Sequence, residues 1–163
     1  MSGFETRARA VLAACNARGI MLATAESCTG GMIAAALTDI AGSSSVVDRG
    51  FVTYSNEAKM EMLGVSPETL AAHGAVSQET ALEMAQGALA HSRASVTVAV
   101  TGIAGPDGGS DEKPVGLVWF GLAMKGRAPV AQSHVFEDRD RAGVRAATVE
   151  TALDMVLSAL QEG

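Results

Sequence analysis

The sequence predicts an α/β protein in which helices cover both faces of a mixed, mostly parallel sheet. Strand-like and helix-like segments alternate through most of the chain, and one β-hairpin is expected in its last third. Only 4% of the residues are aromatic, while alanine and glycine are abundant, so the elements must pack closely through small side chains. The 48% hydrophobic and 18% charged fractions are typical of a packed globule. At 163 residues the chain fits a single domain, residues 1–163.

The first third of the chain predicts a helix, a buried strand and a second helix. Residues 4–18 repeat apolar side chains at helical spacing, and Gly19 ends that pattern. Residues 20–25 form a short continuous apolar run, which is typical of a strand buried on both faces. Turn residues then lead into an alanine-rich helix at 32–40, and a glycine-serine loop at 42–45 closes the unit.

The rest of the chain continues this alternation. Residues 46–54 indicate a strand that is less buried, because Asp48 and Arg49 interrupt it. A short helix at 56–63 is expected to end at Gly64. The later elements expected are a helix start at Ser66 and Pro67, a helix capped by Ser77, a strand at 95–101, hairpin strands at 115–123 and 129–136, and a closing helix through 149–160.

The charge balance argues against a nucleic-acid partner. Twelve Lys and Arg residues against 18 Asp and Glu residues give a net charge of -6, so a broad basic surface for phosphate backbones is not expected. Two cysteines, no signal-like amino terminus and no apolar run of membrane-spanning length predict a cytoplasmic protein with no disulfide and no membrane contact. An anionic ligand would need a local positive site.

The strongest local motif is AESCTGG at residues 25–31, where a buried strand turns into a helix. Ligands of open α/β sheets bind at the carboxyl ends of strands, and the free N–H groups of a helix's first turn attract negative charge. A hydroxyl at this corner therefore lies beside oxyanion donors, which makes Ser27 a candidate nucleophile. The competing interpretation is that Ser27 or Thr29 only caps the helix.

A lysine is the remaining candidate base. The three histidines lie in ordinary contexts, which weakens both a Ser-His-Asp triad and a Cys28 nucleophile with a histidine base. The motif TYSNEAK places Tyr54 at a strand end and Lys59 on the following helix, so that both can point into the cleft of Ser27. A half-buried tyrosine and a solvated lysine are the alternative. The Tyr-to-Lys spacing is one residue longer than the Y-x-x-x-K of short-chain reductases.

The glycine-rich stretch TGIAGPDGG at residues 101–109 follows a strand, and its backbone N–H groups could surround a phosphate. It matches no established phosphate-binding fingerprint, and a flexible connection into the hairpin is an equal alternative. No metal site is expected here, because Asp107, Asp111 and Glu112 lack ligand spacing and neighbouring His or Cys residues. The last helix opens with arginines that are either a solvated face or a phosphate contact. These are Arg139, Arg141 and Arg145.

Several segments stand in a specific order and spacing: TAESCTGG, AGSSSVVDRGFVTYSNEAK, LGV, GAVS, AVTGIAGPDGG and a late R-x-x-x-R-x-x-T helix. Together they resemble the carboxy-terminal domain family of the competence/damage-inducible protein CinA. The resemblance covers nearly the whole chain. Larger members of that family carry an additional amino-terminal domain, so this chain resembles the stand-alone form.

The resemblance implies a three-layer α/β/α sandwich, often in a homo-oligomer, that hydrolyses the carboxamide of nicotinamide mononucleotide to nicotinate mononucleotide and ammonia. The nucleotide is a small-molecule substrate, and neither a metal nor another cofactor is expected. The serine would attack the amide carbon, and the neutral lysine would accept the proton directly or through the tyrosine. The expected site residues are the catalytic Ser27, Tyr54 and Lys59, the oxyanion donors Thr29, Gly30 and Gly31, and the substrate contacts Ser44, Thr101, Gly102, Gly105 and Arg145.

Lys59 can act as a base only if no carboxylate lies beside it, and two other functions are alternatives to the amidase. A carboxylate beside Lys59 would keep its amine protonated, so none of Glu26, Glu57 and Glu61 is expected to pair with it. The main alternative is a non-catalytic module that binds a nucleotide, or a protein partner associated with competence and DNA damage. A reductase using serine, tyrosine and lysine is disfavoured because the dinucleotide-binding glycine fingerprint is missing.

Overall fold

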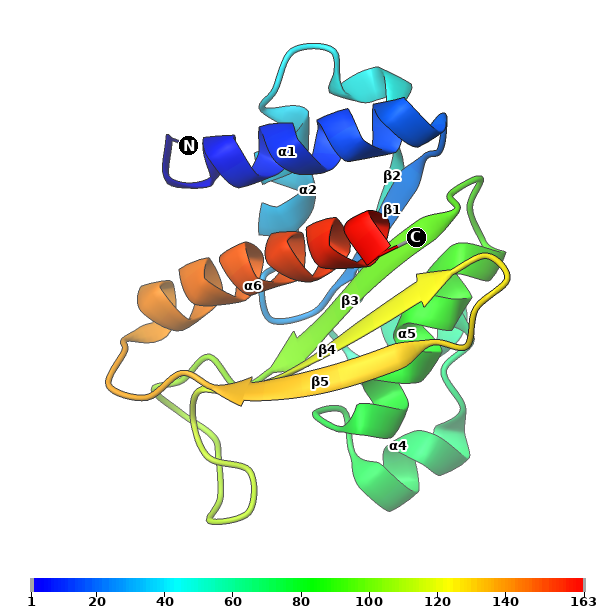
Figure 1. Ribbon diagram of the computed structural model, residues 1–163. Coiled ribbons are helices and arrows are strands. Elements are labelled where there is room, and N and C mark those ends of the chain that lie inside the picture. The colour runs from blue at the N-terminus through cyan, green and yellow to red at the C-terminus, as the bar shows by residue number, and fades with distance from the viewer. Residues whose placement is uncertain (1, 163) are drawn as a thin grey trace.

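The computed structural model describes residues 2–162, and these confirm a three-layer α/β fold on a mixed sheet (Figure 1). The five strands of the described residues lie in the order β2-β1-β3-β4-β5. β1 pairs in parallel with both β2 and β3, whereas β3–β4 and β4–β5 are antiparallel. Only β4 therefore runs against the other strands. The strands are β1 (Leu22–Glu26), β2 (Val47–Val52), β3 (Val96–Gly102), β4 (Leu117–Met124) and β5 (Val130–Val135).

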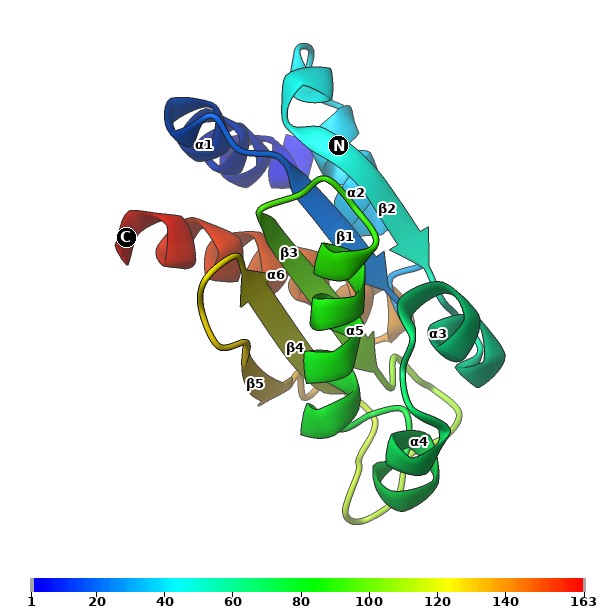
Figure 2. The same cartoon turned by 90° about the vertical axis from the view of Figure 1, so that its right-hand side faces the viewer.

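Helices cover both faces of the sheet (Figures 1 and 2). α1, α2 and α6 lie on one face, and α5 covers the other with α3 and α4 beside it. Each face has its own buried apolar cluster. The helices are α1 (Ser2–Arg18), α2 (Met32–Thr38), α3 (Asn56–Leu63), α4 (Pro67–His73), α5 (Gln78–Ala90) and α6 (Arg141–Glu162), with the 3-10 turn η1 (Ser43–Ser45).

Local sequence signals explain most of the element boundaries. The side chains of Ser55, Ser66 and Ser77 accept backbone N–H groups at the starts of α3, α4 and α5. Gly64, with a positive φ of 70°, ends α3, and the bounds of this helix match the predicted residues 56–63. β1 is buried along its whole length, as its apolar run predicted, and β2 is largely exposed.

Small residues bring the layers close together, as the composition predicted. A Cβ atom on Gly121 of β4 would lie 2.3 Å from the carbonyl oxygen of Ala81 on α5. A Cβ atom on Gly87 of α5 would similarly lie 1.9 Å from the carbonyl oxygen of Leu63. Glycine is therefore required for α5 to approach both the sheet and α3 this closely.

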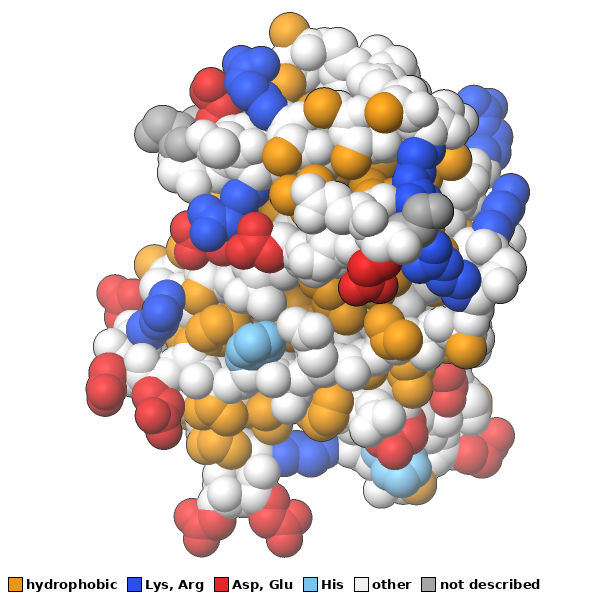
Figure 3. Space-filling view, in the orientation of Figure 1, with side chains coloured by type: hydrophobic (Ala, Val, Ile, Leu, Met, Phe, Trp, Pro, Cys, Tyr) orange, Lys and Arg blue, Asp and Glu red, His pale blue; other side chains and the backbone are white. Residues whose placement is uncertain are grey.

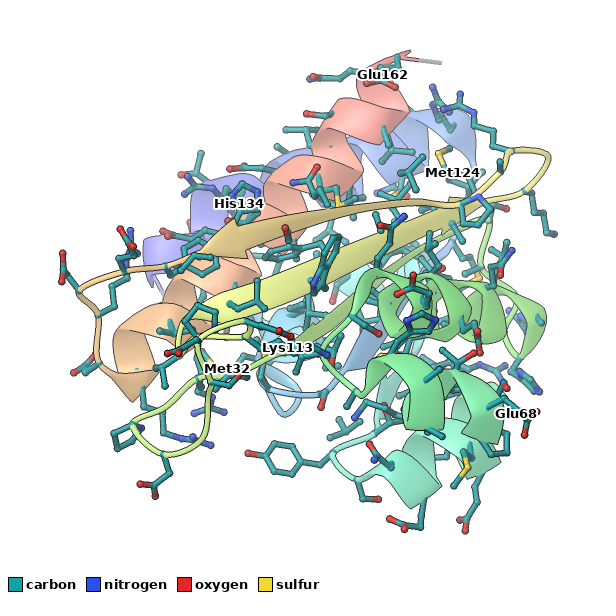
Figure 4. The ribbon with its side chains drawn as sticks, turned by 90° about the horizontal axis from the view of Figure 1, so that it is seen from below. Met32, Glu68, Lys113, Met124, His134 and Glu162 are labelled. Atoms are coloured by element: carbon teal, nitrogen blue, oxygen red, sulfur yellow. The ribbon has the colours of Figure 1, made fainter. Side chains whose placement is uncertain are left out.

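The topology brings three connections to one end of the sheet. Because β1, β2 and β3 are parallel, their carboxyl ends lie at the same edge. β1 leads into the nucleophile turn, defined here as residues 27–31, and β2 leads into α3. β3 leads into the glycine-rich loop, residues 103–116, which Figure 4 shows from below with Lys113 labelled. Within residues 2–162, no helix is long and apolar enough to cross a membrane.

Candidate active site

Ser27 and Lys59 form a hydrogen-bonded pair at the carboxyl end of β1. Lys59 Nζ donates to Ser27 Oγ over 3.0 Å. The backbone N–H of Ser27 donates to the carbonyl of Val100 on β3 (3.0 Å), which ties the start of the turn to the sheet. Both side chains are buried, with Ser27 8% and Lys59 1% exposed. The two residues predicted as nucleophile and base thus contact each other directly, without Tyr54 between them.

The surroundings of Lys59 favour a neutral amine. Nζ also donates to the carbonyl oxygen of Thr53 (2.9 Å), just before α3. Burial lowers the pKa of Lys59 below its ordinary value of 10.5, while the charge of a Cys28 thiolate would act in the opposite direction. None of Glu26, Glu57 and Glu61 forms an ion pair with this amine. The site therefore provides a lysine that can lose its proton and accept one from Ser27.

Cys28 is a poor candidate for the nucleophile. Its side chain is only 5% exposed, and burial raises the pKa of the thiol from 9.0 to about 11. Backbone hydrogen bonding and the cationic Arg145 oppose this rise without cancelling it. The thiol consequently remains protonated near neutral pH, where a cysteine nucleophile has to be a thiolate.

The carboxylate of Glu26 holds the nucleophile turn from inside the protein. Its Oε1 accepts from Thr29 Oγ1 and from the N–H groups of Gly31 (3.3 Å) and Ile33 (2.9 Å). Its Oε2 accepts from the N–H of Ala34 (3.0 Å). Glu26 is fully buried, so these donors satisfy a charge that would otherwise be costly to bury.

The interpretation of Ser27 or Thr29 as a helix cap is wrong. α2 begins at Met32, labelled in Figure 4, and its N-cap residue Gly31 provides no capping side chain. Glu26, at the end of the preceding strand, reaches the free N–H groups of the first turn instead. The helix N-terminus is therefore occupied by a protein carboxylate, and Ser27 is left for another role.

Arg145 of α6 binds carbonyl groups of the same turn. Its Nε donates to the carbonyl oxygen of Cys28 (3.1 Å), and its Nη2 donates to that of Thr29 (3.1 Å). Arg145 was expected to contact substrate, but it is not among the described residues that line the pocket beside Ser27. The structure directs the guanidinium at the backbone of the turn, and the predicted contact with substrate stays a prediction.

A pocket of about 290 Å³ opens beside the Ser27–Lys59 pair. It gathers the predicted Tyr54, Thr101, Gly102 and Gly105, and the hydroxyl of Thr101 donates to the carbonyl of Ala75 (2.9 Å). The nucleophile turn, α3 and the glycine-rich loop all contribute to its wall. Besides those already named, its lining includes Ser27, Cys28, Asn56, Lys59, Asp107 and Arg141.

Arg141 is the cation that faces this pocket. Its Nη1 donates to the carbonyl oxygen of Gly105 (2.8 Å), and its Nη2 donates to the hydroxyl of Tyr54 (2.9 Å). The Tyr54 side chain is 61% exposed, which places the pair at the mouth of the pocket. Arg141 therefore joins the glycine-rich loop to the end of β2 and leaves other guanidinium N–H groups for a ligand.

Two further expectations are changed by the structure. Ser44 lies exposed on η1, before β2 begins, and so at the opposite end of the sheet from this chain's pocket. The N–H of Gly30 donates to the carbonyl of Ser27 (3.0 Å), and that of Gly31 donates to Glu26. Both groups already have protein acceptors, which weighs against their predicted oxyanion role. The role of Thr29 stays a prediction.

Sequence reasoning missed the specific functions of Glu26 and Arg141. The signal for Glu26 was an acid at the end of a fully apolar strand, where burial requires several donors. Arg141 shared its motif with Arg145, and four-residue spacing puts both on one side of a helix. Asp107 was assigned to a solvated acidic loop, and the structure also places it in the pocket wall.

A larger pocket, of about 430 Å³, lies away from this chemistry between β5 and the second half of α6. Its lining includes His134, while His73 and His91 lie at the ends of α4 and α5. Figure 3 shows hydrophobic side chains interspersed with acidic and basic ones on the face formed by α1, α6 and β5. Within the described residues, no histidine lines the pocket of Ser27.

Comparisons with known proteins identify the family of this chain. The family model of the CinA C-terminal domain matches residues 4–160. The nicotinamide-nucleotide amidohydrolase PncC of Escherichia coli K12 is 58% identical over 128 residues, covering 78% of each chain. The protein of the same name from Enterobacter agglomerans is 57% identical over 144 residues, covering 86% of this chain and 88% of that one.

A solved structure shares the whole fold. The competence/damage inducible protein CihA from Agrobacterium tumefaciens has a TM-score of 0.94 and 56% identity, and the match covers 98% of this chain and 96% of that chain. The family match, residues 4–160, extends over the strands, the nucleophile turn and nearly all of α6. The chain belongs to the CinA C-terminal domain family.

Proposed function

We propose that this chain, an amidohydrolase like its relatives, converts nicotinamide mononucleotide to nicotinate mononucleotide and ammonia. The observation that carries the proposal is the buried hydrogen bond between Ser27 and Lys59. The neighbouring glutamates form no ion pair with this lysine. A serine and a neutral lysine form a complete nucleophile-base pair for acyl transfer. Relatives 57–58% identical to this chain carry the name nicotinamide-nucleotide amidohydrolase, which supports the choice of substrate.

The first half-reaction is acylation of Ser27. Its hydroxyl gives a proton to the neutral amine of Lys59 as Oγ forms a bond with the carboxamide carbon. The tetrahedral intermediate then expels ammonia, which takes the proton from the Lys59 ammonium. The Thr53 carbonyl supports both states of the lysine, because it accepts a hydrogen bond from either the amine or the ammonium. The products of this step are ammonia and an ester between Ser27 and the carboxyl group of nicotinate mononucleotide.

The second half-reaction is hydrolysis of that ester. Lys59 takes a proton from water as the water oxygen attacks the ester carbon, and it returns the proton to Ser27 Oγ as the ester bond breaks. Nicotinate mononucleotide leaves and the resting pair is restored. The oxyanion formed in each half-reaction lies at the nucleophile turn, where a backbone N–H such as that of Thr29 is the proposed donor.

The pocket mouth supplies recognition of the nucleotide. Arg141 is the proposed contact of the 5'-phosphate, because a planar guanidinium suits phosphate oxygens and this one lines the pocket. The overall charge of -6 makes such a local cation necessary. Tyr54 then forms part of the wall around the pyridinium ring, and its bond with Arg141 couples ring binding to phosphate binding.

Ammonia release from purified protein tests the proposal. Wild type should release ammonia from nicotinamide mononucleotide in excess EDTA, and Ser27→Ala should reduce the turnover at least about a thousandfold. Nicotinamide riboside, which lacks the phosphate, should be a much poorer substrate. Absence of ammonia with wild type would refute the amidase function and favour a binding module. Equal kcat/KM values for the two substrates would refute the phosphate contact alone.

A further inference from the structure

We infer that Arg145 is a positioning residue for the nucleophile turn and not a ligand of the substrate. The inference goes beyond the proposed function, on which its assay rests. Arg145 is the third side chain that restrains the turn, besides Glu26 and Lys59. Unlike Lys59, it contacts neither Ser27 nor the pocket, and it acts on the backbone that follows the nucleophile.

The contacts of Arg145 fix the direction of two peptide groups. In a trans peptide the C=O and the following N–H point in opposite directions. Because the carbonyl of Cys28 points to Arg145, the N–H of Thr29 points away from it. The carbonyl of Thr29 also points to Arg145, and the N–H of Gly30 donates back to the carbonyl of Ser27 (3.0 Å). Arg145 thus sets the orientation of the proposed oxyanion donor.

An arginine suits this position better than a lysine. Two neighbouring carbonyl oxygens require two donors held at a fixed separation, which a guanidinium fork provides and a single ammonium does not. A Cβ atom on Gly30 would lie 3.5 Å from Nη2, so the guanidinium packs directly against the turn. Glu26 accepts from N–H groups of the same stretch of backbone. The nucleophile turn is therefore held by an anion at its N–H groups and by a cation at its carbonyl groups.

Arg141 provides a matched comparison on the same helix. It lies one turn before Arg145, but its guanidinium binds Gly105 and Tyr54 at the pocket mouth. Loss of Arg141 therefore weakens binding of the phosphate, and loss of Arg145 slows the chemical step. These effects separate into KM and kcat when chemistry is slower than substrate release.

The experiment measures kcat and KM for nicotinamide mononucleotide and nicotinamide riboside. The variants are Arg145→Gln, Arg145→Lys and Arg141→Gln, with Arg9→Gln, an exposed arginine of α1, as the surface control. Both Arg145 variants should lose about 10- to 100-fold in kcat, with KM and the preference for the phosphorylated substrate unchanged. Arg141→Gln should lower that preference. Millimolar guanidinium should partly restore kcat in Arg145→Gln, and sodium chloride should not.

Several outcomes would overturn the assignment of Arg145. A collapse of phosphate preference with normal kcat would make it a substrate ligand. Full kcat in folded Arg145→Gln would show that the turn needs no such restraint. Full kcat in Arg145→Lys would show that charge alone is sufficient. Thermal unfolding identifies folded variants, and Arg145→Lys decides if Arg145→Gln does not fold. An inactive wild type is a different result, because it refutes the proposed function.

Discussion

The nucleophile turn and the glycine-rich loop meet at one pocket, but they are held in different ways. Residues 27–29 of the turn are buried. Glu26 accepts from the N–H of Gly31 and the hydroxyl of Thr29, and Arg145 donates to the carbonyl oxygens of Cys28 and Thr29. The loop is exposed from residue 106 to residue 112. Backbone hydrogen bonds of Ile103 and Gly116 fix its two ends. The carbonyl of Gly105 also accepts a hydrogen bond from Arg141.

This difference assigns different tasks to the two segments. Covalent chemistry needs reacting atoms held to within a fraction of an ångström, which a turn bonded by Glu26, Lys59 and Arg145 provides. Recognition of a nucleotide tolerates more adjustment, and an exposed loop can close around a ligand at little packing cost. Changes at the turn should therefore act mainly on kcat, and changes in the loop should act mainly on KM.

Replacing the lysine that contacts the turn should have the largest effect. A guanidinium stays protonated in the working range of pH, so Lys59→Arg cannot accept the proton of Ser27. The expected loss in kcat/KM is about 100- to 10,000-fold, the usual contribution of a general base. Steady-state ammonia release measures it. Substantial activity with the wild-type pH profile retained would place the base elsewhere.

The same lysine predicts a pH dependence with a definite sign. Since the neutral amine is the active form, kcat/KM of wild type should rise with pH through an apparent pKa below 10.5. Folding stability should also rise with pH between the lowered pKa and 10.5, because the unfolded chain binds more protons there. Lys59→Met should remove that rise in thermal unfolding experiments. An unchanged slope would show that Lys59 is protonated in the folded protein.

A smaller effect is expected in the loop, at Gly105. Its φ is +80°, and a Cβ atom would lie 2.4 Å from Val115 Cγ1, so Gly105→Ala must displace either the Val115 side chain or the backbone of residue 105, whose carbonyl binds Arg141. KM for nicotinamide mononucleotide should rise about tenfold, equivalent to about 1.4 kcal/mol, with kcat little changed. Gly108→Ala is the matched control, because its φ is +86° but its nearest neighbour would be 3.6 Å away. Equal effects of both variants would indicate general backbone strain.

Much of the architecture was predictable because its signals are local. The bounds of α3 follow from a serine cap and a terminal glycine, and the burial of β1 follows from an uninterrupted apolar run. The Ser27–Lys59 pair was also predictable, since parallel strands bring the segments after them to one edge of the sheet. The direct contact between these two side chains could not be read from spacing, which left a relay through Tyr54 open.

The residues whose placement was not foreseen are those that depend on tertiary structure. Arg141 and Arg145 lie four residues apart, on one side of α6. The position of α6 along the sheet determines which of the two reaches the pocket. Ser44 lies in a polar loop that resembles a ligand site, yet the chain direction puts that loop at the other end of β2. Glu26 was expected not to pair with Lys59, which the structure confirms, but its bonds to the first turn of α2 depend on tertiary placement and were not foreseen.

The smallest effect is expected at Cys28, although it is next to the nucleophile and lines the pocket. Its thiol has a pKa raised to about 11 by burial, so less than about 0.1% is thiolate at pH 7. Cys28→Ala also leaves unchanged the backbone carbonyls of residues 28 and 29, which Arg145 binds. The value of kcat should therefore stay within about threefold of wild type. Cys15 is buried in the core and its thiol pKa is also raised to about 11. The two thiols should therefore both react slowly with an alkylating reagent at neutral pH, and Cys15 is the matched comparison for Cys28. If Cys28→Ala were inactive while Ser27→Ala kept its activity, the thiol would be the nucleophile and the pairing of Ser27 with Lys59 would have to be structural.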